Sequence, residues 1–77
     1  MQKTLNLFRP GERGAVVRIA GEGAVKRRLF DMGLTPSAEV VFLKAAPLGD
    51  PVEVEIRGYR LSLRKAEAAS VVMEVKA

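Results

Sequence analysis

Residues 25–36 read VKRRLFDMGLTP and contain the one segment of the chain that is clearly patterned as a helix. Val25, Leu29 and Met32 recur at the spacing that puts side chains on one face of an α-helix. Gly33 stands where helices commonly end in a left-handed residue, a conformation that glycine adopts without a Cβ clash. The proline that closes the stretch then prevents any continuation. The sequence therefore predicts a short amphipathic helix with a Schellman cap.

The chain on both sides of this helix is patterned as β-strands. Residues 52–56 alternate valine or isoleucine with glutamate, and Gly58 marks a reversal into a second alternating run, which together predict a hairpin. Because several short strands cannot all be central in an open sheet, we expect the sheet to curl and remove its exposed edges. The prediction is one mostly β domain over residues 1–77, a small SH3-like β-barrel with a short α-helix at about 24–32, which can plug one open end, and one helical turn near 65–69.

The apolar positions of these elements give a predicted core. Residues on one face of a strand or helix are expected to be buried together. The predicted core is Leu29, Met32, Val41, Leu43, Val54, Ile56, Leu61, Leu63 and Val71 or Met73.

The composition excludes the most common kinds of reactive site. The 77 residues contain neither cysteine nor histidine, so the chain lacks a thiolate or imidazole for a transition metal or a proton shuttle. The carboxylates are scattered, and Glu53 and Glu55 are better read as a solvated strand face than as a metal site. The segment Gly21-Glu22-Gly23 lacks the third glycine of a dinucleotide-binding loop, so no cofactor is expected. No nucleophile–base pair is recognisable, and we expect no enzymatic activity.

The net charge of +4 leaves nucleic-acid binding open as an alternative function. One basic cluster lies at 26–28 and another at Arg57, Arg60, Arg64 and Lys65. Small basic barrels do bind RNA, but the phenylalanines lie in apolar stretches, where we expect them to form core and not to stack on bases. No apolar run reaches the length needed to span a bilayer, and no signal-peptide core follows the start. We therefore expect a cytoplasmic protein with no direct membrane insertion.

Four segments in the same order and spacing resemble the FeoA family of bacterial ferrous iron uptake. They are RRLFDMGLTP at 27–36, APLGDPV at 46–52, RG at 57–58 and LSLRKAEA at 61–68. The resemblance implies an SH3-like barrel and a role as cytoplasmic accessory to FeoB, the membrane permease with a cytoplasmic GTPase domain. Transition-metal binding is associated with the family in general, and this sequence supplies no soft or imidazole ligands for it.

The resemblance and the apolar loops together predict a partner-binding surface. A proline-stiffened loop loses little conformational entropy on docking, so its apolar tip is a good anchor. The predicted contact residues are Leu34, which would otherwise only cap the helix, Pro47, Leu48, Gly49 and Asp50 in the loop, and Arg27 and Arg28 as a charged rim. With FeoB as partner, no nucleic acid is expected; the RNA-binding barrel is the alternative.

Overall fold

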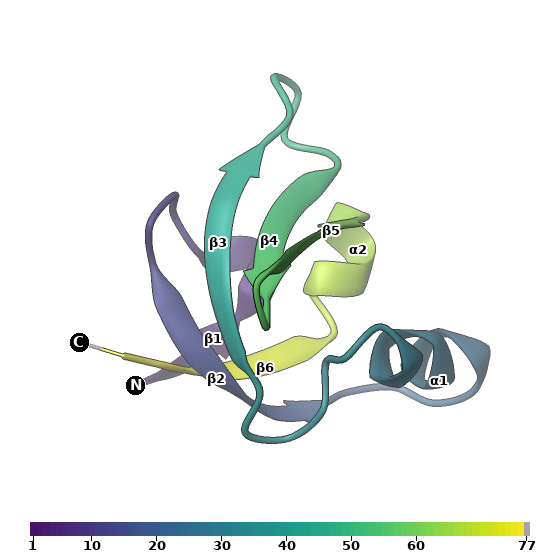
Figure 1. The fold of residues 1–77 in the computed structure, drawn as a ribbon. Coiled ribbons are helices and arrows are strands. Elements are labelled where there is room, and N and C mark those ends of the chain that lie inside the picture. Colours follow the sequence, from purple (N-terminus) through teal and green to yellow (C-terminus); the bar gives the residue numbers. More distant parts are fainter. Residues whose placement is uncertain (77) are drawn as a thin grey trace.

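The computed structural model describes residues 1–76 and contains one curled antiparallel sheet with two helices beside it (Figure 1). The elements are β1 (Gln2–Thr4), the 3-10 turn η1 (Leu5–Leu7), β2 (Arg13–Ile19), α1 (Ala24–Asp31), β3 (Glu39–Ala45), β4 (Val52–Ile56), β5 (Tyr59–Leu63), α2 (Lys65–Ala68) and β6 (Val71–Val75). The prediction of a mostly β fold with one short helix and a later helical turn is confirmed.

The strand order is β1-β6-β2-β3-β4-β5, and every neighbouring pair is antiparallel. Consecutive strands from β2 to β5 pair with one another, whereas β6 returns to pair between β1 and β2. Strands β1 and β5 are the two edges, because each is hydrogen-bonded to a single neighbour. The expectation that curling would remove the edges is therefore wrong for this sheet: it curls without joining its ends.

Helix α1 ends as the sequence predicts. The Leu34 N–H donates to the Leu29 carbonyl at 3.1 Å, the Gly33 N–H donates to the Phe30 carbonyl at 3.0 Å, and Gly33 has a φ of 103°. These are the two hydrogen bonds of a Schellman motif. The helix begins at Ala24, as predicted, but the first residue of its apolar face, Val25, is 49% exposed and lines a hollow between α1 and α2. Only the second half of α1 is packed on the core.

The core contains most of the predicted residues but uses the other face of β3. Val40 and Phe42 are buried, whereas Val41 and Leu43 are only half-buried, so the prediction for β3 is wrong. The run at 40–43 is apolar at every position, so alternation cannot select a face. Pairing with β4 selects it. The buried set is Leu5, Phe8, Val16, Ile19, Leu29, Leu34, Ala38, Val40, Phe42, Val52, Val54, Ile56, Leu63, Ala68, Val71 and Met73, with Met32 and Leu61 partly buried against it.

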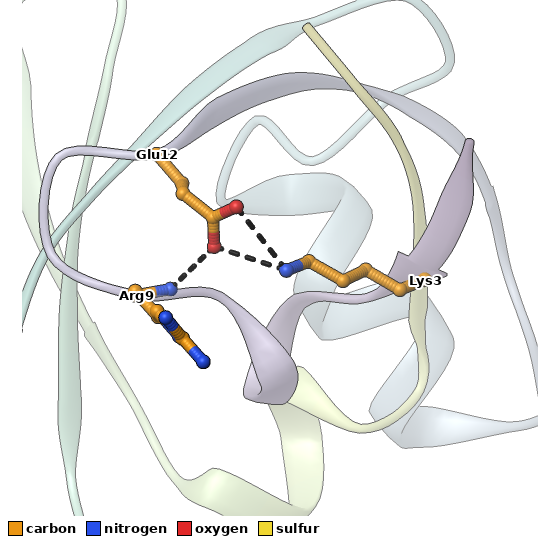
Figure 2. Close-up of polar contacts among 3 residues, drawn as sticks. All are labelled: Lys3, Arg9 and Glu12. Carbon is orange, nitrogen blue, oxygen red and sulfur yellow. Dashed lines mark hydrogen bonds and ion pairs between the residues drawn. The ribbon is translucent and has the colours of Figure 1, made fainter. Parts of the chain in front are cut away.

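A three-residue polar cluster fixes the turn before β2 against β1 (Figure 2). The Lys3 ammonium lies 3.0 and 3.2 Å from the two carboxylate oxygens of Glu12, and the Arg9 backbone N–H donates to the same carboxylate at 2.6 Å. The hydrogen bond from Arg9, followed by that from Lys3, lowers the pKa of Glu12 below its usual value. The cluster holds residues 9–12 in place beside the first strand.

Candidate functional site

The most exposed large apolar side chain in the part of the chain that the structure describes is Leu48, at 95%. It lies at the tip of the β3–β4 connection, residues 46–51, which we call the Leu48 loop. The backbone of this loop is ordered by its own hydrogen bonds: the Gly49 N–H donates to the Ala46 carbonyl at 2.7 Å, and the Ala46 N–H to the Pro51 carbonyl at 2.9 Å. Gly49 has a φ of 87°, which a residue with a side chain rarely adopts. The loop therefore holds Leu48 in solvent.

The Leu48 loop is also tied to the start of α2. The Asp50 carboxylate accepts a hydrogen bond at 3.0 Å from the backbone N–H of Lys65, the first residue of that helix. Asp50 was expected to contact a partner, and it has this structural bond as well. Because the loop is fastened at its base and by Asp50, little loop ordering would remain to oppose docking of Leu48.

The structure separates Leu48 from the arginines that were predicted to surround it. Helix α1 precedes the first residue of β3, whereas the Leu48 loop follows the last one. A seven-residue strand spans about 20 Å, so the two lie at opposite ends of β3 (Figure 1). Arg28 is committed elsewhere, because its guanidinium lies 3.1 Å from the Glu67 carboxylate on α2. Arg27 is exposed on α1. The prediction that Arg27 and Arg28 form a rim around Leu48 is therefore wrong.

Leu34 is also removed from the candidate surface. Its side chain is fully buried, at 0% exposure, and its backbone N–H closes the Schellman motif. The choice between a contact residue and a helix cap, which the sequence left open, is decided in favour of the cap. A hydrophobic residue at this position packs back on the helix it ends.

The basic residues that do lie beside the Leu48 loop are Arg64 and Lys65, with Lys44 on β3. Val52, at the end of the loop, pairs with Leu63, so residues 64 and 65 come next to the loop base. Sequence reasoning missed this arrangement, although counting outward from the two-residue turn at 57–58 gives the same register. Lys44 lies 3.8 Å from the Glu53 carboxylate and is otherwise open to solvent.

The structure also places the residues of the alternative readings. Gly21 and Gly23 have φ values of 91° and 81° and shape the turn into α1. Phe8 and Phe42 are buried and Phe30 is half-buried, which leaves Tyr59 as the aromatic ring with the greatest exposure, at 47%. The Tyr59 hydroxyl donates to the Met32 carbonyl at 3.3 Å. The aromatic side chains are therefore poorly disposed for stacking on bases.

A resident transition metal does not fit the side chains present. The sequence has no cysteine or histidine, and within residues 1–76 no three carboxylates come together as a ligand set. Zinc and iron prefer thiolate or imidazole ligands, and carboxylates bind these metals mostly as additional ligands in the same site. Likewise, the helices among residues 1–76 are too short to cross a lipid bilayer.

Three comparisons place the chain among known proteins. It is 32% identical over 71 residues to the Fe(2+) transport protein A/Fe(2+) transporter FeoB fusion protein of Porphyromonas gingivalis (strain ATCC BAA-308 / W83), a match that covers 92% of this chain and 8% of the relative. The FeoA-like protein from Clostridium acetobutylicum has a TM-score of 0.91 at 37% identity, covering 99% of this chain and 88% of that one. The zinc complex of Stenotrophomonas maltophilia FeoA, described as an SH3 domain protein, has a TM-score of 0.81 at 28% identity, covering 92% and 88%.

The fold is that of an SH3-like barrel, as the sequence predicts. The FeoA domain model matches residues 3–75, and the chain belongs to the FeoA family, which is linked to ferrous iron transport. The chain spans only 8% of the length of the fusion protein, in which a FeoA-like segment and FeoB are parts of one polypeptide.

Proposed function

We propose that this chain is a non-enzymatic binding module of ferrous iron uptake that docks on FeoB through the Leu48 loop. The observation that carries the proposal is the 95% exposure of Leu48 on a loop whose backbone is hydrogen-bonded at its base and to α2. An isolated exposed leucine on a mobile loop would need no explanation. A leucine held outward by an ordered loop is suited to fill an apolar pocket of a partner.

The identity of the partner is supported by the fusion relative. A FeoA-like segment and FeoB in one polypeptide are kept at a high effective concentration, which favours contact between them. The cytoplasmic GTPase domain implied by the family resemblance is the part of FeoB that a cytoplasmic chain would meet. Arg64, Lys65 and Lys44, at the base of the Leu48 loop, would orient an acidic surface and raise the association rate more than the affinity.

The test is a titration of the chain against the purified cytoplasmic part of FeoB from the same organism. Leu48→Glu is expected to weaken binding by at least tenfold, because a charge would be buried in an apolar pocket. The melting temperature of this variant should stay close to that of the unsubstituted chain, because the Leu48 side chain is exposed and does not pack in the core. Leu7→Glu is the matched control, because Leu7 is an exposed leucine, at 59%, on the 3-10 turn η1 and not on the Leu48 loop.

Two results would contradict the proposal. One is unchanged binding by the Leu48→Glu variant, and the other is a loss of binding that Leu7→Glu reproduces. A parallel titration with single-stranded RNA tests the alternative class. RNA binding would show a steep loss of affinity with salt, because it depends on released counterions, and would require the basic residues and not the apolar side chain of Leu48.

A further inference from the structure

We propose that the free edge of β5 is a second binding surface, which takes an extended acidic peptide segment as an additional strand. The strand is the last in the order β1-β6-β2-β3-β4-β5 and pairs with β4 alone. The proposal does not depend on docking to FeoB, because the backbone groups of Arg60 and Ser62 carry it, although Arg64 and Lys65 also lie at the base of the Leu48 loop.

The register identifies which backbone groups face this edge. The turn between β4 and β5 has two residues, Arg57 and Gly58, with φ values of 52° and 86°, so Ile56 and Tyr59 flank it as a hydrogen-bonded pair. Bonding alternates along an antiparallel ladder, so Arg60 and Ser62 direct their N–H and C=O groups away from β4. Within residues 1–76 these four groups have no backbone partner. Both residues are exposed.

The charge along β5 specifies the chemistry of the added strand. Arg57, Arg60, Arg64 and Lys65 are all exposed, and no side-chain ion pair involves them in the described part of the chain. Four unpaired cations over nine residues favour a segment rich in glutamate or aspartate.

Strand β4, which already pairs with β5, has the alternating glutamate and apolar sequence that we propose for the added strand. Strand β4 reads VEVEI, and its Glu55 lies directly opposite Arg60 in the register. A glutamate opposite Arg60 on the added strand would bring a carboxylate beside a guanidinium that has no ion pair within the described residues. A second copy of this chain is a poor occupant, because pairing two β5 strands would bring the cations of both copies, Arg57, Arg60, Arg64 and Lys65, together along one edge.

The length of the site is limited at both ends. At one end, the Tyr59 hydroxyl is bonded to the Met32 carbonyl, which holds the end of α1 beside the strand. At the other end, the Arg64 N–H is bonded to the Glu67 carboxylate at 2.9 Å, where α2 begins. The free edge therefore offers about four backbone hydrogen bonds, enough for a short segment of weak affinity.

The competing reading is that the arginines only prevent edge-to-edge aggregation, as charges on edge strands commonly do. A titration distinguishes the two, with a short synthetic peptide that alternates glutamate and valine as the probe. We expect saturable binding, and slower hydrogen exchange at the amides of Arg60 and Ser62 in the complex. In the free protein these two amides should exchange faster than that of Leu61, which bonds to β4.

Two variants and a control peptide test the assignment. Ser62→Pro removes one edge N–H without touching the β4 ladder and should weaken binding about three- to tenfold. Arg60→Glu should weaken it about tenfold, whereas Arg27→Glu, with the same change in net charge on α1, should have little effect. A peptide N-methylated on the residues that face β5 should not bind. Should Ser62→Pro fail to fold, the pair of arginine variants and the N-methylated peptide decide the question.

Several results would overturn the inference. They are equal binding of the N-methylated peptide, equal effects of Arg60→Glu and Arg27→Glu, absence of peptide binding, and self-association through β5 at the concentrations used. Single-stranded RNA that competes at the same affinity would also overturn it, because it would show a charge effect without strand pairing. Leu48→Ser, which removes the apolar side chain without adding a charge beside Lys65, should leave peptide binding unchanged, so this test and that of FeoB docking succeed or fail separately.

Discussion

Replacing Gly33 by alanine tests the end of α1, the helix that connects β2 to β3. Gly33 has a φ of 103°, and a non-glycine residue in left-handed backbone costs about 1–2 kcal/mol. A Cβ at this position would lie 3.1 Å from the Tyr59 hydroxyl, which is closer than nine in ten Cβ contacts. The ring would have to shift and weaken its hydrogen bond to the Met32 carbonyl, worth about 0.5–1.5 kcal/mol. The two costs together are about 1.5–3.5 kcal/mol.

Thermal unfolding followed by circular dichroism measures this loss. For a domain of this size 1 kcal/mol corresponds to about 4–8 °C, so we expect the melting temperature of Gly33→Ala to fall by roughly 6–28 °C. Gly11→Ala is the control, because Gly11 has a φ of 91° but open space where its Cβ would lie. It should carry the backbone cost alone.

Combining Gly33→Ala with Tyr59→Phe in a double-mutant cycle isolates the contact with the hydroxyl. A melting temperature equal to that of the unsubstituted chain would refute the placement of the helix end, and a loss no larger than that of Gly11→Ala would refute the role of Tyr59.

Two further predictions concern the core and the turn before β2. Leu63→Ala should destabilise the chain by about 2–5 kcal/mol, since Leu63 is fully buried, and Leu61→Ala by less, since Leu61 is partly exposed; urea unfolding measures both, and equal losses would contradict the burial pattern. The folded-state pKa of Glu12 lies below its unfolded value, so its contribution to stability is complete above the unfolded pKa and is lost as the pH falls through the folded pKa. Glu12→Gln should therefore flatten the fall in melting temperature below about pH 4.5, and an unchanged acid profile would count against the cluster.

The candidate site was only partly predictable from the sequence. The Leu48 loop was found because an apolar residue between two prolines has little local means of being buried. Its surroundings were predicted wrongly, because Arg27 and Arg28 lie close along the chain to Leu34, which was grouped with the loop as one surface. The correct neighbours, Arg64 and Lys65, are separated from Leu48 by a complete hairpin.

The sequence by itself determined the elements whose signals are local. The end of α1 depends on Gly33 and the residues within one turn of it, and the hairpin on the alternation around the turn at 57–58. The bounds of β4, the helical turn before β6 and the mostly β class follow from similar short-range patterns. The FeoA resemblance is carried by the same segments.

Only the tertiary structure decided which face of β3 is buried, that Val25 lies over a hollow, and which charges surround the Leu48 loop. A fully apolar run fits the core equally well in either phase, so the choice depends on the pairing of Phe42 with Val54. The distance between α1 and the Leu48 loop depends on β3 extending between them as a strand. The β5 edge is free because no further strand of residues 1–76 pairs beyond β5 in the sheet order. These properties are set by contacts between residues far apart in the chain, which no local pattern encodes.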